Sequence, residues 1–352
     1  MGAVRKLKLL PPSADNPRNS EGSIVELNDG RLYLVYSHFY GGRSDHSAAC
    51  LAARFSEDRG ESWTEEDTEV IGKEGRRNVM SVTLLRLASG ELALFYLVKE
   101  STTDTKLYMR ISEDEGKTWG ERICTMPHEG YHVVNNDRVI QHSSGRILVP
   151  AAWYAIHRGP GICACFHSDD LGKTWEVSKN WVTSGNNRCL NYARHPNAMS
   201  GLQEPGIIEL KDGSLMMLAR CDMGCQFRSY SYDRGESWTV ATTTEIMSPC
   251  SPATVKRIPK TGDLLLIWND HSGRFDFHWG KRSPLCTAVS HDEGKSWKNV
   301  KMLEEDLDGW YCYTSCMFAD EKAILSYCAG NERIGRLSLT QITLIDIDWL
   351  YS

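Results

Sequence analysis

The sequence predicts an all-β fold in which one four-stranded antiparallel unit occurs six times, and three observations support this. An eight-residue pattern, Ser-x-Asp-x-Gly-x-x-Trp, occurs five times at intervals of 56 to 63 residues. Pairs of apolar runs joined by short turns recur between these copies, and segments with helical periodicity are nearly absent. A unit repeated along the chain is typical of repeat architectures, and six four-stranded units in series form a six-bladed β-propeller.

The eight-residue pattern has the chemistry of a turn. Its aspartate can accept hydrogen bonds from nearby backbone N–H groups, and its glycine supplies the positive φ of a tight reversal. The tryptophan three residues later is a large apolar anchor. We therefore expect these boxes to stabilise the architecture and to take no part in catalysis. The five copies are residues 56–63, 112–119, 168–175, 231–238 and 290–297.

The apolar runs between the boxes predict antiparallel hairpins. In the first unit, residues 23–27 and 32–36 flank the turn at residues 28–31. Asp-Gly, Ser-Gly and similar turns between alternating runs are typical hairpin signals. The next four hairpins turn at Ser89-Gly90, Ser144-Gly145, Asp212-Gly213 and Thr261-Gly262, and the sixth, at residues 317–327, has no glycine.

A third and a fourth strand complete each predicted blade. A third strand leads into each box, as residues 50–55 do, and a more polar fourth strand follows the tryptophan. The sixth unit lacks a box and ends with residues 344–350, so we expect residues 5–10 to supply its outer strand. This closure would leave no free sheet edge between the first and last blades. Because no linker interrupts residues 1–352, we expect one propeller domain.

Composition excludes several classes of partner. Hydrophobic residues make up 41% and charged residues 24% of the chain, as in globular domains with a sizeable core. A net charge of -6 without any basic run argues against nucleic acid. No apolar stretch approaches the roughly 20 residues of a membrane helix. The first ten residues lack the apolar core of a signal peptide, which predicts a cytoplasmic protein, or a secreted or periplasmic one whose leader is missing.

The twelve cysteines favour buried thiols in a reducing compartment. A chain of 352 residues does not need a disulfide framework, and several cysteines lie in strand-like runs. The sequence has no Cys-x-x-Cys pair, and the two Cys-x-x-x-Cys pairs, at residues 221–225 and 312–316, have no histidine nearby. A zinc site is therefore not expected.

Candidate functional residues flank the first and second strands of the blades, because these positions meet at one mouth of a propeller. Three or more arginines at such a mouth would repel one another unless they hold an anion, and the guanidinium group is well suited to bind a carboxylate. The polar residues at these positions are Arg18, Asp45, Arg76, Arg77, Asn78, Asn135, Asn136, Asp137, Arg138, Glu204, Arg220, Arg282, Tyr311 and Tyr313.

The boxes, the six hairpins and these positions together resemble the exo-sialidase (neuraminidase) family, and the resemblance covers nearly the whole chain. It implies an arginine triad that binds the carboxylate of sialic acid, with Tyr313 as nucleophile, Glu204 as its general base and Asp45 as acid/base. The triad positions are matched by Arg18, Arg220 and Arg282. The triplet Arg18-Asn19-Ser20 departs from the Arg-Ile-Pro usual in the family.

Three further residues are predicted to bind substrate. Tyr311 is an alternative nucleophile, because residues two apart point the same way on a regular strand. Asn136 and Asp137 belong to an unusually polar strand start, and we expect them to contact a substituent of the sugar. Singly, each candidate also fits a structural role, such as Asp45 capping a turn or the tyrosines packing in a strand.

The resemblance implies a retaining exo-α-sialidase that acts on sialylated glycans and needs no metal or organic cofactor. A neutral phenol can attack an anomeric centre that already bears a carboxylate, whereas an anionic nucleophile would be repelled, and sialidases use such a tyrosine. Two alternatives remain. One is a glycosidase for another carboxylated keto sugar such as Kdn or Kdo, and the other is a non-catalytic carbohydrate-binding propeller.

Overall fold

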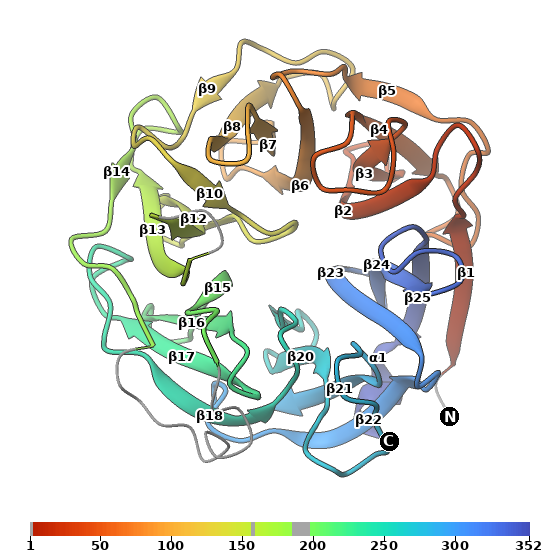
Figure 1. Cartoon of the computed structure of the whole chain (residues 1–352), viewed down its shortest axis with the longest axis vertical. Coiled ribbons are helices and arrows are strands. Elements are labelled where there is room, and N and C mark those ends of the chain that lie inside the picture. Colours follow the sequence, from red (N-terminus) through yellow and green to blue (C-terminus); the bar gives the residue numbers. More distant parts are fainter. Residues whose placement is uncertain (1–2, 156–158, 185–197) are drawn as a thin grey trace.

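The computed structural model describes residues 3–155, 159–184 and 198–352, and its strands surround a central axis in six successive groups (Figure 1). Each group is an antiparallel blade with a meander order, which confirms the predicted six-bladed propeller. Blades two and three are also joined through one parallel pairing, between Tyr131 and Thr105.

Each blade begins with the strand nearest the axis and continues outward. The first strand of blade one contacts the first strands of blades two and six. These innermost strands are β2 (Arg18–Glu26), β6 (Asn78–Arg86), β10 (Tyr131–Val133) with β11 (Ile140–Gln141), β15 (Gln203–Glu209), β19 (Thr254–Arg257) and β23 (Gly309–Ala319). The second strands are β3 (Leu32–Phe39), β7 (Leu92–Lys99), β12 (Ile147–Tyr154), β16 (Leu215–Arg220), β20 (Leu264–Asn269) and β24 (Lys322–Asn331).

The third and outer strands complete the blades. The third strands are β4 (Ala49–Ser56), β8 (Thr105–Ser112), β13 (Ile162–Ser168), β17 (Cys225–Ser231), β21 (Leu285–Ser290) and β25 (Thr340–Asp346). The outer strands of blades one to five are β5 (Thr68–Ile71), β9 (Ile123–Cys124), β14 (Glu176–Val177), β18 (Thr242–Met247) and β22 (Lys298–Glu304).

The outer strand of blade six comes from the N-terminal end of the chain, as predicted. Strand β1 (Val4–Leu10) pairs antiparallel with β25, so that the red and blue ends of the ribbon lie side by side (Figure 1). The predicted last strand at residues 344–350 is only partly correct, because β25 ends at Asp346. Residues Ile347–Tyr351 form the short helix α1. No helix within the described ranges is long and apolar enough to cross a lipid bilayer.

The core lies between neighbouring blades. Each blade packs both of its faces against neighbours, which explains continuous apolar runs such as the fully buried β7. Apolar clusters fill all six interfaces; that between blades one and two includes Tyr33, Val35 and Leu94. The interface that closes the ring, between blades six and one, includes Leu34 and Ile342.

The boxes form hydrogen-bonded turns between third and outer strands. In the first box, Asp58 Oδ1 accepts hydrogen bonds from Ser56 Oγ at 2.9 Å and the Ser62 amide at 2.8 Å. Both the glycine and the residue before it adopt positive φ, 88° at Gly172 and 60° at Leu171 in the third box. A Cβ on Gly172 would lie 2.6 Å from Met109 of the preceding blade. The glycine therefore suits the turn, and it also leaves room for the Met109 side chain of the neighbouring blade.

Candidate active site

A bulge occurs in the innermost strands of several blades at the end nearest the predicted mouth. Pairing with the second strand slips between Ser20 and Ser23 in β2, and equivalent slips occur in β6, β15 and β23. One non-glycine residue near each slip has positive φ, and so does the corresponding residue of blade three. These residues are Glu21, Ser81, Asp137, Glu204 and Tyr313, with φ between 44° and 59°. A bulge re-aims side chains, and such backbone strain is concentrated at functional sites.

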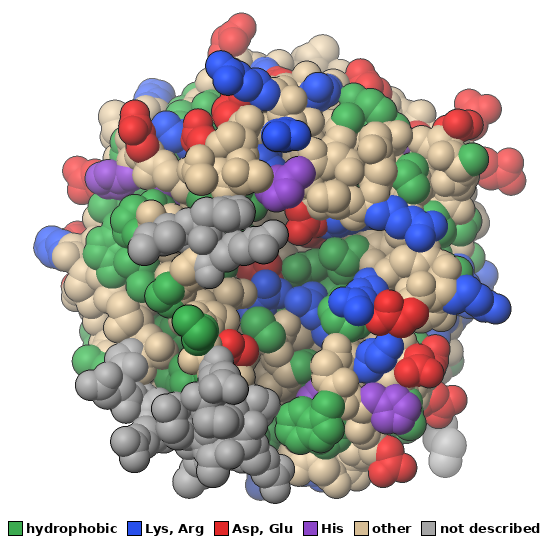
Figure 2. All heavy atoms as spheres, in the orientation of Figure 1, with side chains coloured by type: hydrophobic (Ala, Val, Ile, Leu, Met, Phe, Trp, Pro, Cys, Tyr) green, Lys and Arg blue, Asp and Glu red, His purple; other side chains and the backbone are tan. Residues whose placement is uncertain are grey.

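Four of these five residues line one cavity. It has a volume of about 200 Å³ and is bounded by blades one, two, three, four and six. Figure 2 shows that this face of the molecule is hollowed near its centre, where Lys and Arg side chains lie. The polar residues of the lining are Glu21, Asp45, Ser81, Lys99, Thr105, Tyr131, His132, Asn135, Tyr154, Glu204, Arg220 and Tyr313.

Tyr313, Glu204 and Arg220 form a buried cluster within this lining. The Tyr313 hydroxyl donates to Glu204 Oε1 at 3.3 Å, and Arg220 Nη1 lies 2.7 Å from Glu204 Oε2. Arg220 is oriented by Gln203, whose Oε1 accepts hydrogen bonds from Nε and Nη2. Burial, followed by the negative charge of Glu204, raises the pKa of Tyr313, while Arg220 and Arg282 oppose this shift. The phenol is therefore neutral at rest, and Glu204 is placed to accept its proton.

Arg282 lies against the other side of Tyr313. Its guanidinium carbon is 5.3 Å from the centre of the Tyr313 ring and 5.2 Å from that of Trp310, while Nη2 donates to the Cys250 carbonyl at 3.0 Å. Burial lowers the pKa of Arg282, but the surrounding Cys312, Tyr313 and Glu204 raise it above its ordinary value overall. Two guanidinium groups therefore flank the phenol.

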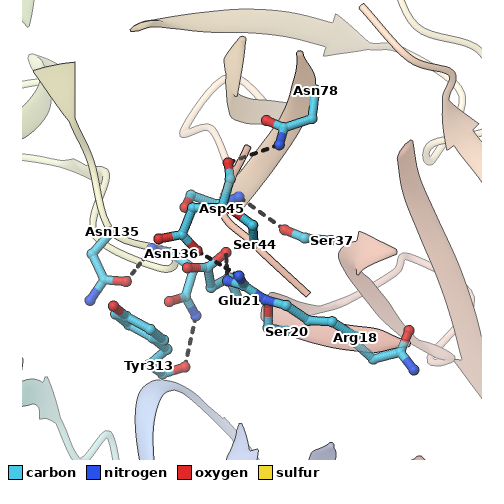
Figure 3. A network of polar contacts seen from close by, with 12 residues as sticks. Arg18, Ser20, Glu21, Ser37, Ser44, Asp45, Asn78, Asn135, Asn136 and Tyr313 are labelled. Atoms are coloured by element: carbon cyan, nitrogen blue, oxygen red, sulfur yellow. Dashed lines mark hydrogen bonds and ion pairs between the residues drawn. The ribbon is translucent and has the colours of Figure 1, made fainter. Parts of the chain in front are cut away.

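Arg18 and Asp45 lie together in blade one (Figure 3). Arg18 is 1% exposed, and its guanidinium stacks over Phe39 at 4.3 Å. Its Nη1 donates to Asp45 Oδ1 at 2.5 Å, and Nε donates to Ser20 Oγ at 2.9 Å. Burial raises the pKa of Asp45, but the Arg18 charge and hydrogen bond outweigh this effect and lower it below its usual value.

Blade two fixes the loop that carries Asp45. The Asp45 carbonyl accepts hydrogen bonds from Asn78 Nδ2 and Lys99 Nζ, both at 3.0 Å, and Asn78 also donates to the Ser47 carbonyl at 2.7 Å. The carboxylate itself is 55% exposed at the cavity. Asp45 is thus held by its backbone, while part of its side chain is accessible to a ligand.

Six of the predicted site residues are therefore brought together. Tyr313, Glu204, Asp45 and Arg220 line the cavity, Arg18 contacts Asp45, and Arg282 contacts the Tyr313 ring.

Asn136 and Asp137 are placed differently from the prediction that they bind substrate. Asn136 is fully buried, and its Nδ2 donates to the carbonyls of Gly22 at 2.7 Å and Tyr313 at 3.0 Å. Asp137 accepts from the Cys316 amide at 3.0 Å and pairs with Lys256 at 2.9 Å. Neither residue lines the cavity. Their polar atoms instead tie the innermost strands together, because buried backbone groups at the bulges need partners.

The adjacent Arg138 completes this arrangement. Its Nη2 donates to Thr254 Oγ1 at 2.9 Å and to the Ala253 carbonyl at 3.2 Å in blade five. We call Asn136, Asp137 and Arg138 the axial cluster. It connects blade three to blades one, five and six.

Tyr311 also differs from the expectation. It packs in the core between blades five and six, with its ring 6.4 Å from that of Tyr327. The bulge between Cys312 and Ser315, with φ of 59° at Tyr313, breaks the alternation that would place both tyrosines on one face. Tyr311 is therefore a packing residue, and Tyr313 alone of the two lines the cavity.

Seven polar residues of the cavity lining were missed as site residues: Glu21, Ser81, Lys99, Thr105, Tyr131, His132 and Tyr154. Lys99 ends an apolar strand, and Tyr131 and His132 precede the polar segment of blade three. The signal for Lys99 was its place at the end of a second strand, the position that Arg220 occupies in blade four. Glu21 had no such signal.

Comparison with known proteins identifies the family of this chain. Residues 41–325 match the family model described as a BNR repeat-like domain. The chain belongs to this BNR repeat-like family. One relative of this chain is a sialidase from Clostridium perfringens. The two are 23% identical over 281 residues, which cover 73% of this chain and 69% of that protein. The predicted resemblance to sialidases is thereby confirmed.

Solved structures give the same architecture. A Trypanosoma rangeli sialidase in complex with the inhibitor DANA superposes with a TM-score of 0.72 at 15% identity, over 98% of this chain and 60% of that one. A protein of unknown function from Dyadobacter fermentans superposes with a TM-score of 0.75 at 16% identity, over 98% of this chain and 99% of that one. At these identities the likeness shows the fold alone. This BNR repeat-like chain spans about three fifths of the trypanosomal enzyme.

Proposed function

We propose that this protein is a retaining exo-α-sialidase, and the observation that carries the proposal is the buried contact of Tyr313 with Glu204 beside two arginines. The sialidase relative supports a function within that family. A phenol 3.3 Å from a carboxylate has the arrangement of an activated nucleophile and its base. A binding site for a sugar would not need a proton acceptor at this position.

The substrate is proposed to bind through its carboxylate. Arg220 and Arg282 lie beside the phenol, and Arg18, held by Ser20 and Phe39, contacts the lining residues Asp45 and Glu21. Arginine forks bind carboxylates with two parallel hydrogen bonds, which fix both position and orientation. A sugar held in this way would present its anomeric carbon to Tyr313, and fixed geometry lowers the barrier to attack.

Proton transfer is proposed to divide between two carboxylates. As the Tyr313 oxygen bonds to the anomeric carbon, Glu204 accepts the phenol proton. Asp45 donates a proton to the departing glycosidic oxygen and then takes one from the water that releases the sugar, so that configuration is retained. In the free protein Arg18 keeps the pKa of Asp45 low. A substrate carboxylate on Arg18 would weaken that pairing and raise the pKa of Asp45, which suits its role as an acid.

The test is release of methylumbelliferone from its α-sialoside. We expect turnover by the wild type and a loss of at least about 100-fold in kcat for Tyr313→Phe and for Asp45→Asn, since each removes a reacting group. Tyr311→Phe is the matched control, because it makes the same change on the same strand within the core. Normal turnover by Tyr313→Phe would refute the proposal.

The same assay separates the alternatives. A better rate on the corresponding Kdn glycoside would assign the enzyme to another carboxylated keto sugar. Calorimetric binding of sialoside without any turnover would identify a carbohydrate-binding propeller.

A further inference from the structure

Glu21 is a buried carboxyl in the cavity that the mechanism above does not use. It occupies the bulge of β2 and is 6% exposed, and it lines the same cavity as Glu204, Tyr313 and Asp45. The Glu21 backbone has a positive φ, as do those of Glu204 and Tyr313. A strand bulge with this backbone conformation therefore directs all three side chains into the cavity. The following glycine is fixed by packing, because a Cβ on Gly22 would lie 2.9 Å from Leu34.

The contact between Glu21 and Arg18 is incomplete. Glu21 Oε2 lies 3.5 Å from Arg18 Nη2, which is an ion-pair distance without a hydrogen bond. Among the described residues, neither of these two atoms has a hydrogen-bond partner, although both are buried. Nε and Nη1 of Arg18 are occupied by Ser20, Asp45 and the Arg43 carbonyl. Arg18 Nη2 and Glu21 Oε2 are therefore the two unpaired atoms of this contact, beside the cavity that Glu21 lines.

We propose that Glu21 is a substrate-binding residue: in its neutral form it donates a hydrogen bond to the ligand carboxylate that Arg18 holds. This assignment rests on the proposed function. Buried polar atoms without partners are costly, and one oxygen of a ligand carboxylate that contacts both Nη2 and Oε2 would satisfy both. An ionised Glu21 would instead repel that carboxylate. Binding is then accompanied by uptake of one proton whenever Glu21 is ionised in the free protein.

The surroundings of Glu21 favour a carboxyl group that gains and loses its proton near neutral pH. Burial raises its pKa to about 7, with Asp45 and Glu204 raising it and Arg18 and Lys99 lowering it. The titratable and charged groups that act on it from its own strand and the neighbouring elements are Arg18, Asp45, Lys99, Tyr131, Glu204 and Cys328.

The test is calorimetric binding of the unsaturated sialic acid analogue DANA between pH 6 and 8, in buffers of different ionisation enthalpy. For one group with a pKa near 7, the wild-type Kd should rise about tenfold over this range, with about 0.9 proton taken up per ligand at pH 8. Glu21→Gln keeps a neutral donor of the same shape, so its Kd should change by less than about twofold, without proton uptake. Glu21→Ala should bind more weakly at every pH.

Glu26→Gln is the matched control, because Glu26 lies at the far end of β2 and pairs with Arg59. It should retain the wild-type pH dependence. Equal proton uptake by the wild type and Glu21→Gln would overturn the assignment to Glu21 while leaving the proposed function intact. Failure of the analogue to bind the wild type or Glu21→Gln at any pH would instead contradict the proposed function, and the assignment with it.

Discussion

Replacing Asn136 with alanine tests the structural role of the axial cluster. The Asn136 amide donates to two carbonyls, those of Gly22 in blade one and Tyr313 in blade six. Both acceptors belong to bulges, and the amide is fully buried. The substitution would leave both carbonyls without this donor and would create a small void at the axis.

The size of the effect follows from the two lost bonds. A buried acceptor left without its donor costs about 1–3 kcal/mol, so two should lower the free energy of unfolding by about 2–6 kcal/mol. Replacing an exposed asparagine should lower the free energy of unfolding by less than about 0.5–1 kcal/mol. Asn28→Ala is therefore the matched control, since Asn28 is exposed and its side-chain amide donates to Glu115 Oε1 at 2.9 Å.

The assay is urea denaturation followed by tryptophan fluorescence at pH 7, which gives the midpoint and slope for each variant. We expect a lower midpoint for Asn136→Ala and little change for Asn28→Ala. If Asn136 bound substrate, as the sequence suggested, its replacement would leave the midpoint unchanged and would raise only KM. That result would refute the role assigned to the axial cluster.

Two further predictions concern charge. Arg220→Met removes the arginine that lies 2.7 Å from buried Glu204. We expect a loss of about 2–4 kcal/mol in transition-state stabilisation, which lowers kcat/KM on the methylumbelliferyl substrate about 30- to 1,000-fold. An effect below threefold would contradict the assigned contact. Hydrogen bonds from the neighbouring threonine or serine lower the pKa of Asp114, Asp170 and Asp292 to about 2. Because these pKa values are depressed in the folded state, the stabilisation is present above about pH 4 and is lost as pH falls toward 2. The urea midpoint should fall over that window, and the triple Asp→Asn variant should show a flatter dependence; equal slopes would show that the boxes do not contribute.

The fold could be predicted because its signals are local and repeated. Each box combines a turn aspartate, a glycine with positive φ and an anchoring tryptophan, and each hairpin alternates around a short turn. The closing strand β1 was predictable for a different reason: a propeller with five complete blades and an incomplete sixth blade needs one more strand. The end of β25 was not, because residues 347–350 continue the apolar–polar pattern of the strand in the sequence, whereas the structure places them in α1.

The site was predictable where a residue lies at a strand end or matches a position of the sialidase family. Arg18 begins β2 and Arg220 ends β16, whereas Asp45, Glu204, Arg282 and Tyr313 were found through the family resemblance. Glu21 was missed because a bulge places it, and glutamate gives no sign of positive φ in a sequence. The same effect separated Tyr311 from Tyr313, since strand alternation holds only where the pairing register is continuous.

Asn136 and Asp137 show the opposite error. Their polarity at a strand start suggested substrate contacts, yet the bulges of other blades expose carbonyls and amides that only long-range neighbours can satisfy. These backbone groups need hydrogen-bond partners from other blades. That need arises only when the ring closes, so no local pattern in the sequence indicates it.

Covalent trapping on Tyr313 tests the central claim most directly. The protein would be incubated with 2,3-difluorosialic acid, digested and analysed by mass spectrometry, with Tyr313→Phe and Tyr311→Phe in parallel. We expect a sialyl adduct on the peptide that contains Tyr313 in the wild type and in Tyr311→Phe, and no adduct in Tyr313→Phe. An adduct on Glu204 or any other residue, or turnover of sialoside by Tyr313→Phe without an adduct, would contradict the account.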